Sequence, residues 1–122
     1  MPVRGIRGAV QAPSDTPEAI NTQTKTLLRE MVAANDIRPD DIISIFFTTT
    51  VDLTADFPAA AARQLGWTDV PLLGAQEMEA KDGMPRVIRV LMHVESERTR
   101  AQIRHIYLGE AVKLRPDWTP PV

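Results

Sequence analysis

The amino-acid sequence predicts an α+β domain in which a mixed β-sheet carries two main helices on one face. Segments with strand and helix periodicity alternate along the chain, and only two segments keep helical spacing over a useful length. A chain of 122 residues is the size of one ordinary domain. We therefore expect a single domain over residues 1–117, followed by a flexible C-terminal tail at residues 118–122.

The first strand and the first helix are predicted from the N-terminal third of the chain. Residues 1–10 alternate small or apolar residues with arginine, as strands do, and residues 11–15 break this pattern. Thr16 can cap a helix that has Pro17 at its first position and that runs to about Asn35. The apolar stripe of this helix, which would cover one sheet face, is formed by Ile20, Leu27, Leu28, Met31 and Val32.

The second strand and second helix follow in the middle of the chain. Residues 41–50 contain a β-branched and aromatic run that predicts a central strand buried on both faces. Asp56 can cap a short helix with Pro58 in its first turn, and residues 59–65 are good helix formers. Gly66 stands where a left-handed C-terminal residue belongs.

Two further strands are predicted at residues 70–78 and 85–95, joined as a hairpin by a turn at Lys81-Asp82-Gly83. A last apolar patch lies at Ile106-Tyr107-Leu108. With both helices on one side, the other face of the sheet needs cover, and a second copy of the same chain is the simplest source of it. A closed homo-oligomer is therefore a structural expectation.

Composition excludes several classes of function. The formal net charge is −2, with 16 acidic and 14 basic residues, so a broad surface for nucleic acid or anionic lipid is not expected. The chain has no cysteine, which favours a reducing cytoplasm. The N-terminus lacks the apolar segment of a signal peptide, and no apolar run approaches the roughly 18 residues of a membrane span. We expect a cytoplasmic protein.

Two arginines occupy strand positions where apolar residues are usual, Arg7 in the first strand and Arg89 in the fourth. A guanidinium stays charged when buried, so an arginine within an apolar strand needs an anion beside it. Arginine outnumbers lysine by eleven to three, and its planar fork binds carboxylates through two hydrogen bonds. A small dicarboxylate is the ligand that this pattern favours.

The remaining candidate groups are hydrogen-bonding groups rather than nucleophiles. Glu77 near a strand end supplies an acceptor, and Tyr107 supplies a hydroxyl. His93 and His105 do not have a metal-ligand spacing, and no metal site is expected. No serine stands in a nucleophile-elbow motif, and no glycine-rich phosphate loop occurs, so no cofactor is expected either.

Short blocks between residue 3 and about residue 117 carry the most specific pattern in the sequence: Val3-Arg4-Gly5-Ile6-Arg7-Gly8-Ala9, Asp52-Leu53, Asp56-Phe57-Pro58-Ala59-Ala60-Ala61-Ala62-Arg63, Val70-Pro71-Leu72, Gln76-Glu77-Met78, Ile88-Arg89-Val90, Ile103-Arg104-His105-Ile106-Tyr107-Leu108 and Leu114-Arg115-Pro116-Asp117. In their order and in nearly all of their spacing, these blocks resemble the small monofunctional chorismate mutases of the Bacillus type, the AroH class. The resemblance implies a homotrimer built as a pseudo-α/β-barrel, with an active site in each cleft between subunits.

The resemblance also implies a reaction, the intramolecular Claisen rearrangement of chorismate to prephenate in phenylalanine and tyrosine biosynthesis. One ether C–O bond breaks while a C–C bond forms, and no proton has to move. This reaction suits a site with donors but no nucleophile, cofactor or metal, because the enzyme holds a compact conformer and stabilises charge on the ether oxygen.

Four catalytic residues are implied by the resemblance. Arg89 would face the ether oxygen and one carboxylate, and Arg7 would bind a substrate carboxylate. Tyr107 would form a hydrogen bond beside Arg7, and Glu77 would accept a hydrogen bond from the ring hydroxyl.

The resemblance implies further substrate-binding residues around these four. The loop of Leu73, Gly74, Ala75 and Gln76 would line the same pocket. From the neighbouring subunit would come Phe57 as a wall of the pocket, with Arg63 and Arg115 at its mouth.

Two departures from the family pattern lie at this pocket. Gly74 stands where relatives often carry a cysteine or another polar side chain, and Ala60 replaces a charged residue of some relatives.

Two other interpretations of the function remain open from the residues alone. One is a trimeric imine-deaminase-like hydrolase, and the other is a noncatalytic trimer that binds a small anion.

Overall fold

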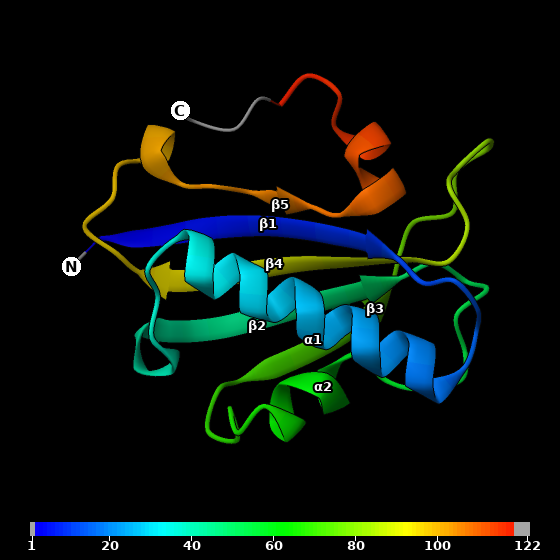
Figure 1. The fold of residues 1–122 in the computed structure, drawn as a ribbon, viewed down its shortest axis with the longest axis horizontal. Helices are drawn as coiled ribbons and strands as arrows, with labels where there is room; N and C mark the ends of the chain where they lie inside the picture. The colour runs from blue at the N-terminus through cyan, green and yellow to red at the C-terminus, as the bar shows by residue number, and fades with distance from the viewer. Residues whose placement is uncertain (1, 119–122) are drawn as a thin grey trace.

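The chain folds into one five-stranded mixed sheet with strand order β3-β2-β4-β1-β5 (Figure 1). The computed structural model describes residues 2–118. The strands are β1 (Val3–Gln11), β2 (Ile42–Thr49), β3 (Leu72–Gln76), β4 (Val87–Glu95) and β5 (Ile106–Tyr107). The helices α1 (Pro17–Ala34) and α2 (Ala59–Gln64) both lie on one face of the sheet, which confirms the predicted fold class. Short 3₁₀ helices occur at Pro39–Asp41, Arg100–Gln102 and Gly109–Leu114.

Helix α1 begins as its sequence predicts. The Thr16 hydroxyl accepts a hydrogen bond from the backbone N–H of Ala19 at 3.1 Å, which satisfies one of the free donors of the first turn. Pro17 occupies the first helical position, where its missing N–H costs nothing. The face that α1 presents to the sheet is fully buried and consists of Ile20, Thr24, Leu27, Leu28 and Met31.

Strand β4 lies in the middle of the sheet and pairs antiparallel with β1 and with β2. Its residues alternate between the two faces, as the period of a strand requires. Those that face the helices, Ile88, Val90, Met92 and Val94, are buried. Arg89, Leu91 and His93 point to the opposite face, which carries no α-helix within residues 2–118 and is called the open face below.

The predicted hairpin between the third and fourth strands is wrong. Strand β3 pairs parallel with β2 at the edge of the sheet, whereas β4 lies on the other side of β2. The connection through α2 returns the chain parallel to β2, as crossover connections do. Residues 77–86 then form a loop that is long enough to pass the end of β2, and the turn residues Asp82 and Gly83 lie within it.

Two smaller predictions are also corrected. Strand β2 is not buried on both faces, because Phe46 is 41% exposed and Ile43 is 39% exposed. Asp56 does not cap α2: its carboxylate accepts from the N–H of Phe57, and Pro58 occupies the N-cap position. Gly66 has the expected left-handed backbone, with φ of 91°.

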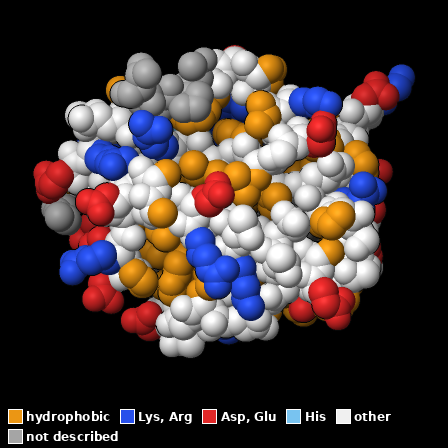
Figure 2. Space-filling model, viewed as in Figure 1, with side chains coloured by type: hydrophobic (Ala, Val, Ile, Leu, Met, Phe, Trp, Pro, Cys, Tyr) orange, Lys and Arg blue, Asp and Glu red, His pale blue; other side chains and the backbone are white. Residues whose placement is uncertain are grey.

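The face that carries α1 displays acidic and basic side chains in close mixture (Figure 2). This mixture fits the small formal net charge of −2. No helix within residues 2–118 is long and apolar enough to cross a membrane.

Candidate active site

The register of the sheet brings the predicted catalytic residues together on the open face. Ala9 of β1 lies opposite Arg89 of β4 and beside Tyr107 of β5. Arg7 lies opposite Leu91, so it is the diagonal neighbour of Arg89 on the same face. Two arginines that are 82 positions apart in the numbering thus become neighbours through strand pairing alone.

Glu77 reaches the same place from the end of β3. Its backbone N–H donates to the carbonyl of Thr49 at 2.7 Å, which extends the pairing of β3 with β2 by one residue. Its carboxylate accepts a hydrogen bond from the Thr48 hydroxyl at 2.7 Å, at Oε2. The other oxygen, Oε1, accepts a 3.2 Å bond from the N–H of Met78. Both carboxylate oxygens are therefore held before any ligand binds.

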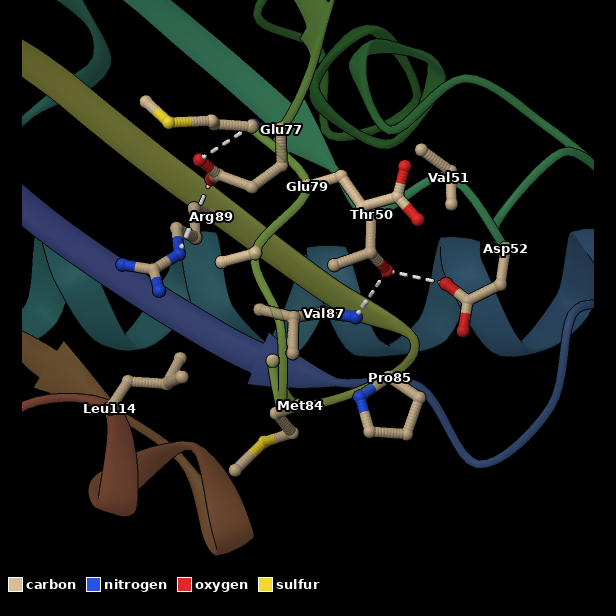
Figure 3. Close-up of a pocket in the computed structure, with 13 residues that line it drawn as sticks. Thr50, Val51, Asp52, Glu77, Glu79, Met84, Pro85, Val87, Arg89 and Leu114 are labelled. Atoms are coloured by element: carbon tan, nitrogen blue, oxygen red, sulfur yellow. Dashed lines mark hydrogen bonds and ion pairs between the residues drawn. The ribbon is translucent and has the colours of Figure 1, made fainter.

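Together these side chains form a hollow of about 320 Å³ on the open face. Its lining consists of Arg7, Gly8, Phe46, Thr48, Glu77, Arg89, Val90, Leu91 and Tyr107. A second, adjoining hollow of about 460 Å³ shares Glu77 and Arg89 and is bordered by the loop at residues 77–86 (Figure 3). The four predicted catalytic residues all line the first of these hollows.

Arg89 has a buried nitrogen that lacks a hydrogen-bond partner within residues 2–118. Its Nε lies 3.3 Å from Oε2 of Glu77, close enough for an ion pair but without hydrogen-bond alignment. The terminal nitrogens of the guanidinium point away from Glu77 (Figure 3). A buried donor without an acceptor is costly and points to an acceptor that the ligand supplies.

Tyr107 is half-buried next to this charge. Burial raises the pKa of its phenol above the ordinary value of 10.0, while the nearby Arg89 charge acts in the opposite direction. The hydroxyl is therefore a neutral donor at physiological pH. The Trp118 ring lies beside it, with centroids 6.3 Å apart, and also packs against His105. Trp118 begins the predicted flexible tail, whose remaining residues 119–122 lie outside the described part of the chain.

Arg7 is held by a hydrogen bond from its backbone to a side chain, in addition to the pairing of β1 with its neighbouring strands. Its N–H donates to Nδ1 of His105 at 2.9 Å, which links β1 to the segment before β5. His105 is therefore a packed histidine that accepts a backbone hydrogen bond. No group of three or more His, Cys, Asp or Glu side chains within residues 2–118 is arranged to hold a metal ion.

Three of the four predicted loop residues lie in a different hollow from Arg89. Gly74, Ala75 and Gln76 line a hollow of about 380 Å³ together with Phe57, which is 77% exposed. Leu73 is 58% exposed on β3, opposite Phe46. In a single chain, the structure does not bring this set together with the four catalytic residues.

The remaining predicted residues are at the periphery. Arg63 is exposed in the last turn of α2. Arg115 pairs with Asp117 through two hydrogen bonds of 3.1 and 3.0 Å, and this pairing raises the pKa of Arg115 and lowers that of Asp117. Arg115 also lines a small hollow with Tyr107 and Trp118.

The sequence alone did not identify Thr48, Phe46 and Leu91 as lining residues. Thr48 is the first of three consecutive threonines, and nothing local distinguishes it from the other two. Only the pairing of Thr48 with Arg89 across β2 and β4 places its hydroxyl on the open face. The alternation of β2 could have identified Phe46 and Thr48. If Ile45 and Phe47 are assigned to the buried face, Phe46 and Thr48 fall on the opposite face.

Comparisons with known proteins place the chain in a family. Residues 3–118 match the family model for chorismate mutase type I. The chain is 50% identical over 116 residues to chorismate mutase AroH of Thermus thermophilus, covering 94% of this chain and 95% of the relative. It is 44% identical over 118 residues to chorismate mutase AroH of Bacillus subtilis (strain 168), covering 96% and 93%. A solved chorismate mutase from Clostridium thermocellum matches with a TM-score of 0.87 at 42% identity, covering 88% of this chain and 96% of that one.

Proposed function

Because the chain belongs to the type I chorismate mutase family and converts chorismate to prephenate, we propose that this reaction takes place in the hollow of Arg7, Glu77, Arg89 and Tyr107. The family relationship confirms the reaction predicted from the sequence and sets aside the hydrolase and the noncatalytic trimer. The product serves the biosynthesis of aromatic amino acids. A cytoplasmic location remains a prediction that rests on the cysteine-free composition.

The observation that carries the proposed site is the buried Nε of Arg89, which has no hydrogen-bond acceptor within residues 2–118. In the rearrangement the ether C–O bond breaks as the new C–C bond forms, so negative charge develops on the ether oxygen. We assign Arg89 to that oxygen and to an adjacent carboxylate. A preorganised charged donor is worth about 3–4 kcal/mol in such a position.

The other three residues bind and orient the substrate in this proposal. Arg7 and the neutral Tyr107 hydroxyl supply donors for a second carboxylate, which fits their place beside Arg89. Glu77 is an acceptor with both oxygens already held, and it would receive the ring hydroxyl. Even slow enzymes lower the barrier by about 8 kcal/mol, so holding a compact conformer has to supply about half of the effect.

The site is proposed to be completed by a second subunit in a homotrimer. Phe46 and Leu91 are 41% and 39% exposed at the hollow of Arg89, and contiguous exposed apolar side chains are typical of an interface. The hollow of Phe57, Gly74, Ala75 and Gln76 would supply the opposite wall. This arrangement assigns the loop at residues 73–76, with Phe57 and Arg63, to the neighbouring subunit, and Arg115 to the mouth.

The purified protein tests the proposed reaction directly. Chorismate is added without cofactor, and loss of its absorbance is followed together with prephenate formation and ammonia release. We expect stoichiometric prephenate and no ammonia. Absorbance loss accompanied by ammonia, or no loss at all, would contradict the assignment.

A further inference from the structure

We propose that Thr48 is a positioning residue that acts through Glu77, an inference that rests on the proposed function of Glu77. Thr48 lies on β2 directly opposite Arg89 on β4, and its side chain lines the hollow on the open face. An ionised carboxylate only accepts hydrogen bonds, so the 2.7 Å contact has the Thr48 hydroxyl as donor and Oε2 of Glu77 as acceptor.

The same oxygen faces the catalytic arginine. Oε2 of Glu77 is 3.3 Å from Nε of Arg89, yet that nitrogen forms no hydrogen bond within residues 2–118. The threonine thus holds Oε2 in a place where it contributes charge to the site without aligning with the Arg89 donor. Without the threonine, only the 3.2 Å bond from the Met78 N–H to Oε1 restrains the carboxylate. Oε2 can then turn toward Nε and satisfy it, which would occupy the donor that the substrate needs.

Strand geometry makes Thr48 a rigid anchor. A β-branched residue in a strand has a restricted χ1 angle, so its hydroxyl has a defined direction. The backbone of Glu77 is tied to the neighbouring Thr49 carbonyl at 2.7 Å, so the two partners cannot drift apart. The position of one catalytic oxygen is therefore set by the second strand, although the catalytic residue itself follows the third.

Thr48→Val tests this inference, because valine keeps the shape and the strand preference but cannot donate. We expect kcat/KM to fall about tenfold or more, the size of a lost hydrogen bond to a charged group, mainly through kcat. Thr48→Ser, which restores the hydroxyl, should recover most of the loss. Ser44→Ala is the matched control. It removes a hydroxyl of the same strand, but this hydroxyl forms a hydrogen bond with His93 and not with Glu77, so the kinetics should be unchanged.

A double-mutant cycle separates positioning from a merely structural role. In a Glu77→Ala background the acceptor is absent, so adding Thr48→Val should change kcat/KM less than twofold. An equally large loss in both backgrounds, or a normal Thr48→Val enzyme beside a strongly impaired Glu77→Ala enzyme, would overturn the role of Thr48. Normal activity of Glu77→Ala would instead overturn the proposed site. Circular dichroism and titration with prephenate show for each variant that the fold and the pocket persist.

Discussion

At the scale of single residues, Arg89 combines a buried nitrogen, unpaired among the described residues, with a side chain that is open to a ligand. Its Nε is buried and without an acceptor within residues 2–118, while its side chain as a whole remains 41% exposed toward the hollow. A charged donor that is already oriented in a partly buried site stabilises developing charge better than mobile water does, because it does not have to reorient during the reaction. This combination is what makes the residue suited to an oxygen that gains charge during a reaction.

Replacing Arg89 tests this role. Arg89→Gln should lower kcat/KM about 10²–10³-fold, because a charged donor to the developing oxyanion is lost. Arg89→Lys should recover little, because an ammonium group lacks the planar fork. Steady-state kinetics give the ratio, and sedimentation shows whether assembly is unchanged. Near-normal activity of Arg89→Gln in an intact assembly would refute the mechanism.

His105 gives a second prediction at this scale, on stability. Burial lowers the pKa of His105 below its ordinary value of 6.5, and Nδ1 accepts the Arg7 N–H only when it is unprotonated. The unfolded chain therefore binds this proton more readily than the folded chain does. The contribution is fully present above pH 6.5 and is lost as the pH falls below 6.5 toward and through the folded pKa.

Denaturant unfolding from pH 7.5 to about pH 5 measures this effect. The free energy of unfolding of the wild type should decrease toward acid, and a His105→Gln variant should show a smaller slope. His93→Gln is the matched control, because it removes the other histidine of the chain and leaves the Arg7 contact in place. Equal slopes in the wild type and His105→Gln would refute the linkage.

At the scale of elements, the packing of α1 on β1 depends on a missing side chain. A Cβ at Gly8 would lie 2.5 Å from Sδ of Met31 and 3.1 Å from Cδ1 of Leu27. The helix and the strand approach each other closely at this point, directly behind the hollow that Gly8 also lines. The apolar pattern of the sequence predicted that α1 covers the sheet, and the glycine determines how near it lies.

Gly8→Ala should therefore destabilise the fold by about 1–3 kcal/mol, the usual cost of overpacking. Gly5→Ala on the same strand is the control, since its Cβ would meet only Cδ1 of Leu91, at an ordinary 3.6 Å. Thermal or denaturant unfolding of both variants gives the difference. Equal stability of the two variants would show that Met31 moves aside without cost.

At the scale of the whole molecule, the proposed site is divided between two hollows of one chain. Arg7, Arg89 and Tyr107 line one hollow, and Phe57 and Gly74 line the other. If each active site combines the first hollow of one subunit with the second hollow of its neighbour, a lone subunit has no complete site. Activity should then depend on assembly.

Subunit complementation measures this dependence. Arg89→Gln disables the first hollow, and Phe57→Asp places a negative charge in the second hollow, against an anionic substrate. Each homotrimer should be nearly inactive, whereas co-refolded equal mixtures should regain activity at about a quarter of the sites, those with two unaltered halves. Sedimentation equilibrium checks for a trimer of the 13.5 kDa chain. No recovery in mixed trimers, or an active monomer, would contradict the shared site.

The sequence alone was sufficient for features that depend on neighbours along the chain. The Thr16 cap, the apolar stripe of α1 and the left-handed Gly66 each follow from local stereochemistry, so they were predicted and observed. The family relationship was also predicted from the sequence, since the blocks around Arg7 and Arg89 keep their order and spacing.

Only the tertiary structure decided which distant residues meet. Strand periodicity shows that Arg89 and Leu91 share a face, but it does not show which strand lies beside them. The insertion of β4 between β1 and β2, in place of the predicted hairpin, is a non-local choice that depends on burying one sheet face under both helices. That choice places Thr48 opposite Arg89 and within reach of Glu77, and no pattern along the chain encodes this meeting.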